Sequence, residues 1–156
     1  EESKTNDVTL RVGPGEVGVA IEIGRPTLGM SIADIQKITR AIARAGVHKI
    51  EPHNPIHSMI ADEATGDLKP EMLGERVLSA IIEINVKRHE LRGILRTLKE
   101  VAQEVDSVFC IDACAIVEPG LKIPEEVLES IRAEGFTWRP NAKINMGLGR
   151  AWENQG

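Results

Sequence analysis

Histidine and cysteine side chains are the candidates for metal binding in this sequence. His53 and His57 are separated by three residues, a spacing that is compatible with zinc. Cys110 and Cys114 are also separated by three residues, which matches no zinc or redox motif. Prolines beside the histidines favour an extended segment, in which the two imidazoles need not converge. The alternatives are a metal site that uses these four residues and histidines that lie exposed in a loop.

A second set of ionisable and thiol side chains is expected on one face of a β-sheet. Side chains alternate along a strand, so apolar residues face the core and the others face away from it. The outward set is Glu22, Glu83, Cys110, Asp112 and Cys114. Such a patch could bind a metal, carry paired carboxylates for acid–base chemistry, or lie in a subunit interface. The interface is favoured, because Ala20, Val77 and Ile81 make this face too apolar to lie bare.

A repeated order of strand, helix and strand would position these residues. Alternating apolar residues predict the strands, and apolar residues three and four apart predict the helices. The predicted elements are strands over residues 17–23, 47–50, 78–84 and 108–112 and helices over residues 31–45 and 89–105. Superposing the halves places Glu22 on Glu83, which supports an internal repeat. We therefore predict an α+β, ferredoxin-like βαββαβ fold, with a four-stranded antiparallel sheet and helices on one face.

Local signals predict the ends of the first helix. Ser31 is a typical N-cap residue, and Asp34 three positions later completes a variant of the capping box. Gly46 is typical of the residue that follows a helix. In the predicted strand order, His53 and Cys110 lie near opposite edges of the sheet, so a metal site that uses both would need a dimer.

Three segments lie outside the repeated elements. Residues 1–16 form an N-terminal segment before the domain at residues 17–117, and residues 118–156 form a C-terminal helix and an extended tail. The helix is expected to start at Pro124. Within the domain, residues 51–76 are a long polar connection: an extended strand with a hairpin, a functional loop, or an irregular crossover.

The tail is basic and aromatic, unlike the residues before it. Trp138 and Trp152 are expected to be anchors, together with Arg139, that dock the tail on a partner or a neighbouring subunit.

Composition narrows the classes of function. The chain has 156 residues, a formal net charge of -5 and only 3% aromatic residues. The negative charge argues against binding to phosphate backbones, and the scarcity of aromatics argues against base stacking, so nucleic acid is not an expected partner. No apolar run is long enough to span a bilayer, so membrane insertion is not expected. The chain has two cysteines, too few for a disulfide framework, which favours a reducing, cytoplasmic location.

The predicted topology over residues 17–117 resembles the ferredoxin-like group that includes ACT-type regulatory domains. The ligand-binding loop of many ACT domains is not recognisable, so this resemblance implies no ligand. Residues 45–50, AGVHKI, leading to His53-Asn54-Pro55, are similar to archaeal methanogenesis accessory proteins such as the methyl-coenzyme M reductase operon protein D family. That similarity implies an accessory or assembly role in an anaerobic archaeon, and it transfers no catalytic residue.

We expect a non-catalytic accessory, assembly or binding protein that acts as a homo-oligomer or as a subunit of a larger, methanogenesis-related complex. The alternative is a regulatory domain that senses a small molecule or a metal. An enzyme that uses Glu22, Glu83 or His53 as acid or base ranks last, because no nucleophile, oxyanion donor or cofactor motif accompanies them. No cofactor is expected.

Overall fold

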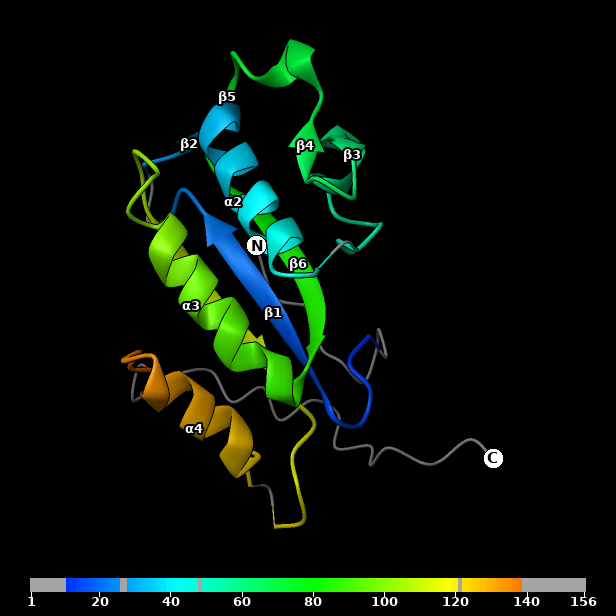
Figure 1. Cartoon of the computed structure of the whole chain (residues 1–156), viewed down its shortest axis with the longest axis vertical. Helices are drawn as coiled ribbons and strands as arrows, with labels where there is room; N and C mark the ends of the chain where they lie inside the picture. The colour runs from blue at the N-terminus through cyan, green and yellow to red at the C-terminus, as the bar shows by residue number, and fades with distance from the viewer. Residues whose placement is uncertain (1–10, 26–27, 48, 121, 139–156) are drawn as a thin grey trace.

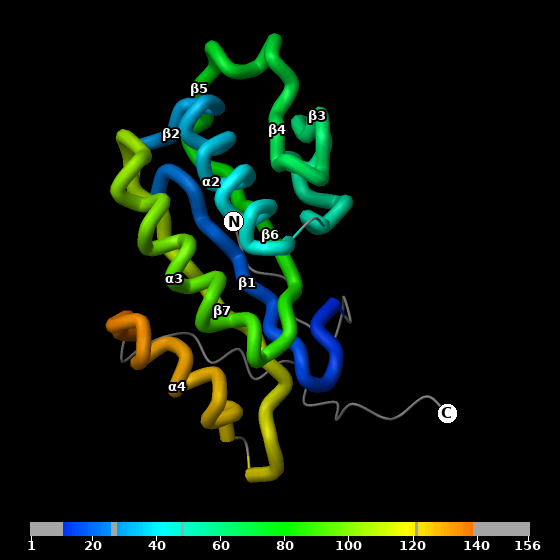
Figure 2. Tube along the Cα trace, viewed as in Figure 1, coloured from blue at the N-terminus to red at the C-terminus, as the bar shows by residue number. Residues whose placement is uncertain are grey.

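The chain has an α+β fold in which helices cover one face of an antiparallel sheet (Figures 1 and 2). The computed structural model describes residues 11–25, 28–47, 49–120 and 122–138. The α-helices within these ranges are α2 (Ile32–Arg44), α3 (Leu91–Val101) and α4 (Glu125–Ala133). The predicted fold class is therefore confirmed at the level of α+β with small antiparallel sheets.

The main sheet has three strands in the order β6-β1-β7. They are β1 (Glu16–Ile23), β6 (Ala80–Lys87) and β7 (Phe109–Cys114), and both outer strands run antiparallel to β1. In β1, buried residues alternate with half-buried ones along the whole strand, as the sequence pattern predicts. The predicted strands at residues 17–23, 78–84 and 108–112 therefore exist, with bounds shifted by one to three residues.

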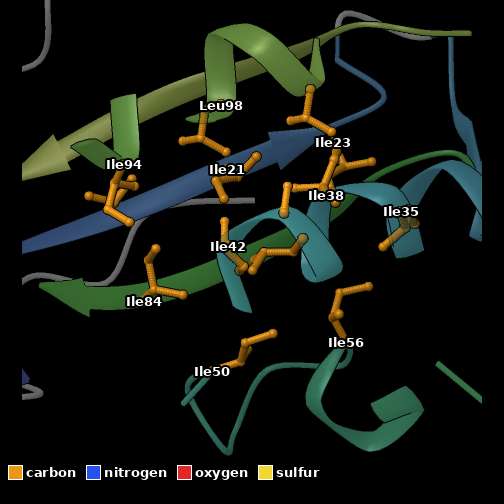
Figure 3. Close-up of a cluster of buried hydrophobic side chains, with 14 of the residues drawn as sticks. Ile21, Ile23, Ile35, Ile38, Ile42, Ile50, Ile56, Ile84, Ile94 and Leu98 are labelled. Atoms are coloured by element: carbon orange, nitrogen blue, oxygen red, sulfur yellow. The ribbon is translucent and has the colours of Figure 1, made fainter. Parts of the chain in front are cut away.

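Isoleucine, valine and leucine fill the space between this sheet and the helices. Figure 3 shows Ile21 and Ile23 of β1 between Leu98 of α3 and Ile38 of α2. All four side chains are fully buried. Burial of this kind stabilises the fold, and truncation of one such side chain to alanine typically costs about 2–5 kcal/mol.

The ends of α2 follow the local signals in the sequence. The Asp34 N–H donates a hydrogen bond to Ser31 Oγ at 3.1 Å, and Ser31 Oγ donates to Asp34 Oδ2 at 2.8 Å. Ala45 is the C-cap, and Gly46 follows it with φ of 93°. A residue with a side chain rarely adopts this conformation, so the predicted helix end at Gly46 is confirmed.

The predicted second strand is the part of the four-stranded sheet that does not form. Residues 47, 49 and 50 belong to no strand, and among the described residues of this segment a backbone hydrogen bond from Glu51 N–H to Glu83 O, at 2.9 Å, reaches β6. Pro52 has no N–H to continue a ladder. The Asn54 N–H then donates to Glu51 O at 3.0 Å, which turns the chain away from the sheet. The prediction of four strands was wrong for this reason.

Residues 51–76 form a small layer on the outside of α2. The 3₁₀ helix η1 leads into the hairpin of β3 and β4, and η2 then leads to β5, which pairs with β2. Their bounds are β2 (Met30–Ser31), η1 (His57–Met59), β3 (Ile60–Asp62), β4 (Asp67–Leu68), η2 (Pro70–Met72) and β5 (Arg76–Val77). The hairpin that the sequence allowed is present, but it follows a turn rather than an extended strand.

Polar side chains of α2 hold this hairpin. Thr39 Oγ1 donates a hydrogen bond to Gly66 O at 2.6 Å, and Gln36 Oε1 accepts one from Leu68 N–H at 2.9 Å. Thr39 and Gln36 are buried, and their side-chain oxygens are hydrogen-bonded. A buried polar group without such a partner would cost about 1–3 kcal/mol.

The second half of the chain adds the helix α4 to the outer side of α3. The 3₁₀ helix η3 (Arg88–Glu90) leads into α3, which ends at Val101, before the predicted end at residue 105. The helix α4 begins at Glu125, one residue after the predicted start at Pro124, which is its N-cap, and Val127 is buried in the core. Within the described ranges, no helix has the length and apolar character needed to cross a membrane.

Candidate functional site

The sheet face away from the helices carries the five residues that the sequence placed there. Pairing puts Glu22 opposite Cys110 and Ile81, Ala20 opposite Asp112 and Glu83, and Gly18 opposite Cys114 and Asn85. Paired residues lie on the same face of a sheet, so these side chains share one surface. We call this surface the open face. Each of its three rows consists of one β1 residue, Gly18, Ala20 or Glu22, and its two partners on β6 and β7.

The carboxylates of the open face do not form a pair with one another. Glu83 and Asp112 both lie opposite Ala20, on its two sides, so their Cα atoms are roughly 9–10 Å apart. Glu22 forms an ion pair with Arg25, with 3.1 Å between Oε2 and Nη1. Acid–base chemistry by two adjacent carboxylates, one of the open interpretations, therefore lacks its geometry.

Glu83 joins three parts of the chain. Its Oε1 lies 2.8 Å from Arg11 Nη1, and Asn54 Nδ2 lies 3.4 Å from its Oε2. Asn54 is buried, and its Oδ1 accepts a hydrogen bond from Ile56 N–H at 2.9 Å. The carboxylate thus holds the turn after residue 51 and the residues before β1 against β6. Sequence reasoning missed both partners; a polar Asn between two prolines was the one local signal.

Residues 11 and 12 cover part of the open face. Asn85 Nδ2 donates a hydrogen bond to Arg11 O, and Val12 is buried. A Cβ added at Gly18 would meet Val12 Cγ2 at 2.8 Å, so Gly18 leaves the space that Val12 occupies. The chain itself therefore buries one apolar part of the face, where the sequence led us to expect a subunit.

The two cysteines are free thiols at different positions along β7. Burial of the sulfur raises the pKa of the Cys114 thiol, although the nearby positive charge of Arg11 acts in the opposite direction. A raised pKa keeps the thiol protonated at neutral pH, and the thiolate is the form that binds metals and attacks electrophiles. Cys114 is thus poorly suited to either role.

The histidines do not meet the cysteines or each other. His53 is exposed, and His57 Nε2 lies 3.1 Å from Glu63 Oε1 instead of facing His53. Among the described residues, no group of three or more His, Cys, Asp or Glu side chains is placed to hold a metal ion. A metal site on His53, His57, Cys110 and Cys114 stays a prediction. The described residues of a single chain do not bring these four side chains together as a metal site.

Three exposed apolar residues whose backbones lie close together at the end of β1 were not predicted. The side chains of Leu28, Leu78 and Val108 are 63%, 84% and 39% exposed. Their backbones meet around Gly24, whose N–H donates to Val108 O at 3.0 Å and whose O accepts from Leu28 N–H at 3.0 Å. A Cβ at Gly24 would lie 2.9 Å from Leu78 O. We call Leu28, Leu78 and Val108 the Gly24 patch.

A groove lies between the end of α2, the edge of β6 and the first half of α3. Its volume is about 590 Å³, and Lys49, Asn85, His89 and Thr97 contribute polar groups to its wall. A Cβ added at Gly93 would meet no atom within 4 Å, so this side of α3 is open. The groove exists where a fourth strand would otherwise pair with β6.

The predicted tail anchors lie largely outside the described residues. Trp138 is described: it is 47% exposed, and the Arg132 guanidinium lies over its ring at 5.5 Å. Arg139 and Trp152 lie outside the described residues. An exposed indole beside a guanidinium is the kind of side-chain pair found at protein interfaces.

Comparisons with protein-family models, with curated proteins and with solved structures find no match to this chain.

Proposed function

We propose that this protein is a non-catalytic accessory or assembly protein that binds other proteins, copies of itself included. The Gly24 patch is the observation that carries the proposal. Three large apolar side chains, carried by three segments whose backbones meet at Gly24, are exposed to water there. Burying such side chains yields roughly 25 cal/mol per Å² of apolar surface, so a partner that covers the patch gains affinity.

The ion pairs of the open face fit this proposal better than they fit catalysis. Glu22 and Glu83 are each bound by an arginine of the same chain. A general base has to be within hydrogen-bond reach of a substrate proton, whereas these carboxylates already accept hydrogen bonds or ion pairs from the protein. The sheet therefore serves as a rigid support for the surfaces around it.

The proposal is tested at Leu78, the most exposed residue of the patch. The variant Leu78→Asp should weaken association of the full chain at least tenfold in sedimentation velocity, because a charge would be desolvated at the interface. The matched control is Ile123→Asp, since Ile123 is also exposed but lies outside the patch. Equal association of the wild type and both variants would contradict the proposed docking role, and so would a wild-type chain that stays monomeric and binds no protein.

A small-molecule sensor is the second candidate, and the groove beside β6 favours it. Its volume suits a metabolite, and its wall combines an ammonium, an imidazole and a hydroxyl group. Gly93 lines the groove and a Cβ there would meet no atom within 4 Å, so Gly93→Leu should place a side chain in the groove. Thermal-shift titration with the twenty amino acids and with nucleotides would detect binding; a shift that Gly93→Leu abolishes would favour the sensor.

We also propose that the core is a ferredoxin-like unit whose second strand has separated from the sheet. Two features support this: the antiparallel order β6-β1-β7, and the backbone hydrogen bond from Glu51 N–H to Glu83 O where the missing strand would pair. The free thiols at Cys110 and Cys114 are consistent with a cytoplasmic protein.

A further inference from the structure

The directions of the backbone groups in the main sheet follow from one hydrogen bond. Glu51 N–H donates to Glu83 O, so the carbonyl of Glu83 points away from β1. Along an antiparallel strand, the N–H and C=O groups of successive residues point alternately to one side and to the other. Ala20 and Glu83 lie opposite each other as a non-hydrogen-bonded pair, because Glu83 points its backbone groups away from β1. Ala20 therefore directs its own N–H and C=O to the other side, where it pairs with Asp112 of β7.

The outer edge of β7 is consequently unpaired. Because the backbone groups of Asp112 bond to β1, those of its neighbours Ile111 and Ala113 point the other way, away from the sheet. The same holds for Phe109, two residues before Ile111. None of these three residues has a hydrogen bond to another group along that edge within the described ranges. The edge thus presents a continuous row of free donors and acceptors.

The two edges of the sheet differ in their protection. At β6, Glu51 occupies the Glu83 carbonyl, and Glu90 Oε2 accepts the Lys87 N–H at 2.8 Å. At β7, the residues Phe109–Cys114 carry one charge, Asp112, and include no lysine, no proline and no bulge, which are devices with which proteins block strand pairing. A bare edge of this kind is a site for strand addition.

We propose that β7 pairs antiparallel with β7 of a second copy of this chain, with the two-fold axis at Ile111. The inference rests on the proposed function as an assembly protein and names its partner. Phe109 would lie opposite Ala113 of the second copy, and Ile111 would lie opposite Ile111 of the second copy. All three outward residues then bond in both chains, which gives about six backbone hydrogen bonds.

The side chains of β7 favour this register. On the helix side, the half-buried Phe109 and Ile111 would extend the apolar core across the axis. On the open face, Cys110 would lie opposite Asp112, a pair without charge repulsion. A two-fold axis at Asp112 would instead place two carboxylates opposite each other, which is destabilising, and would lose about two of the backbone hydrogen bonds. An axis at Cys110 loses the same number.

The variant Ala113→Pro tests the edge. Ala113 is exposed and its N–H points away from β1, so proline removes an outward donor while the pairing with β1 is kept. The wild type should be a dimer by light scattering, and Ala113→Pro should dissociate at least tenfold more readily. The control Ala113→Ser retains the N–H and should remain a dimer. A dimeric Ala113→Pro whose circular dichroism melting curve matches the wild type would overturn the proposal.

The variant Asp112→Cys tests the register without disturbing the fold. In the proposed pairing the new thiol lies opposite Cys110 of the second copy, so mild oxidation should cross-link the dimer through that pair, identified by peptide mass spectrometry. A Cys110–Cys110 cross-link in the wild type would place the axis at Cys110 and overturn the register. If Leu78→Asp abolishes association while Ala113→Pro does not and Asp112→Cys gives no cross-link, the edge pairing is wrong and the docking role stands.

Discussion

The guanidinium of Arg11 lies 2.8 Å from Glu83 Oε1, and this contact ties the residues ahead of β1 to β6. Both side chains are 21% exposed, so water screens the pair less than it screens most surface ion pairs. A double-mutant cycle with Arg11→Ala and Glu83→Ala, followed by urea unfolding, should give a coupling free energy of about 0.5–1 kcal/mol. The more exposed pair of Arg132 and Glu125 is the control and should give close to zero. Equal coupling in both cycles would contradict a structural role for the Arg11–Glu83 contact.

Gly66 should tolerate no side chain. Its φ is 76°, and an added Cβ would lie 2.3 Å from Thr39 O on α2. Gly66→Ala should therefore lower the free energy of unfolding by about 2–4 kcal/mol, through backbone strain and loss of the contact between the hairpin and α2. Gly74→Ala is the matched control, because a Cβ there meets no atom within 4 Å. Chemical denaturation compares the two; similar values would mean that the hairpin can move off α2 at little cost.

Gly93 should be a site where substitution stabilises the protein. It lies in α3, is exposed, and has open space around the position of a Cβ. Gly93→Ala should raise the free energy of unfolding by about 0.5–1 kcal/mol, because alanine loses less backbone entropy in a helix. The melting temperature would rise by a few degrees. A decrease would show that the groove wall needs the glycine for a reason other than helix formation.

Acid should weaken the attachment of α4 to α3. Hydrogen bonds from Arg96 and then Arg92 lower the pKa of Glu134 from 4.5 to about 2. Because the folded-state pKa is lowered, the stabilisation is complete above pH 4.5 and is lost as the pH falls through about 2. Protection factors of the α4 amides, which correct for the intrinsic pH dependence of hydrogen exchange, should therefore fall between these pH values in the wild type.

The variant Glu134→Gln isolates this effect. It removes the charge that Arg92 and Arg96 bind, so the protection factors of the α4 amides should be low already at neutral pH and should change little on acidification. Glu129→Gln, which removes an exposed α4 carboxylate that has no ion pair among the described residues, is the control and should keep the wild-type profile. If Glu134→Gln also keeps that profile, another carboxylate governs the acid response.

Local patterns in the sequence predicted the three strands of the main sheet and the helices α2, α3 and α4, and which side of each strand faces the core. Alternation along β1, β6 and β7 placed Glu22, Glu83 and Asp112 on one surface, because a strand repeats every two residues whatever lies around it. Ser31 and Gly46 predicted the ends of α2, since a cap bonds to its own helix. These features depend on neighbours in the chain and need no knowledge of the tertiary structure.

The tertiary structure alone decided what those side chains contact. Nothing in the sequence paired Glu83 with Arg11 and Asn54, gathered Leu28, Leu78 and Val108 around Gly24, or turned the chain away from β6 after Glu51. Each of these depends on residues distant in the chain that compete for the same space and the same hydrogen bonds. Whether a strand completes a sheet depends on that competition. The backbone hydrogen bonds of an added strand replace hydrogen bonds to water, so their net contribution to stability is small, and a favourable turn can outweigh a few of them.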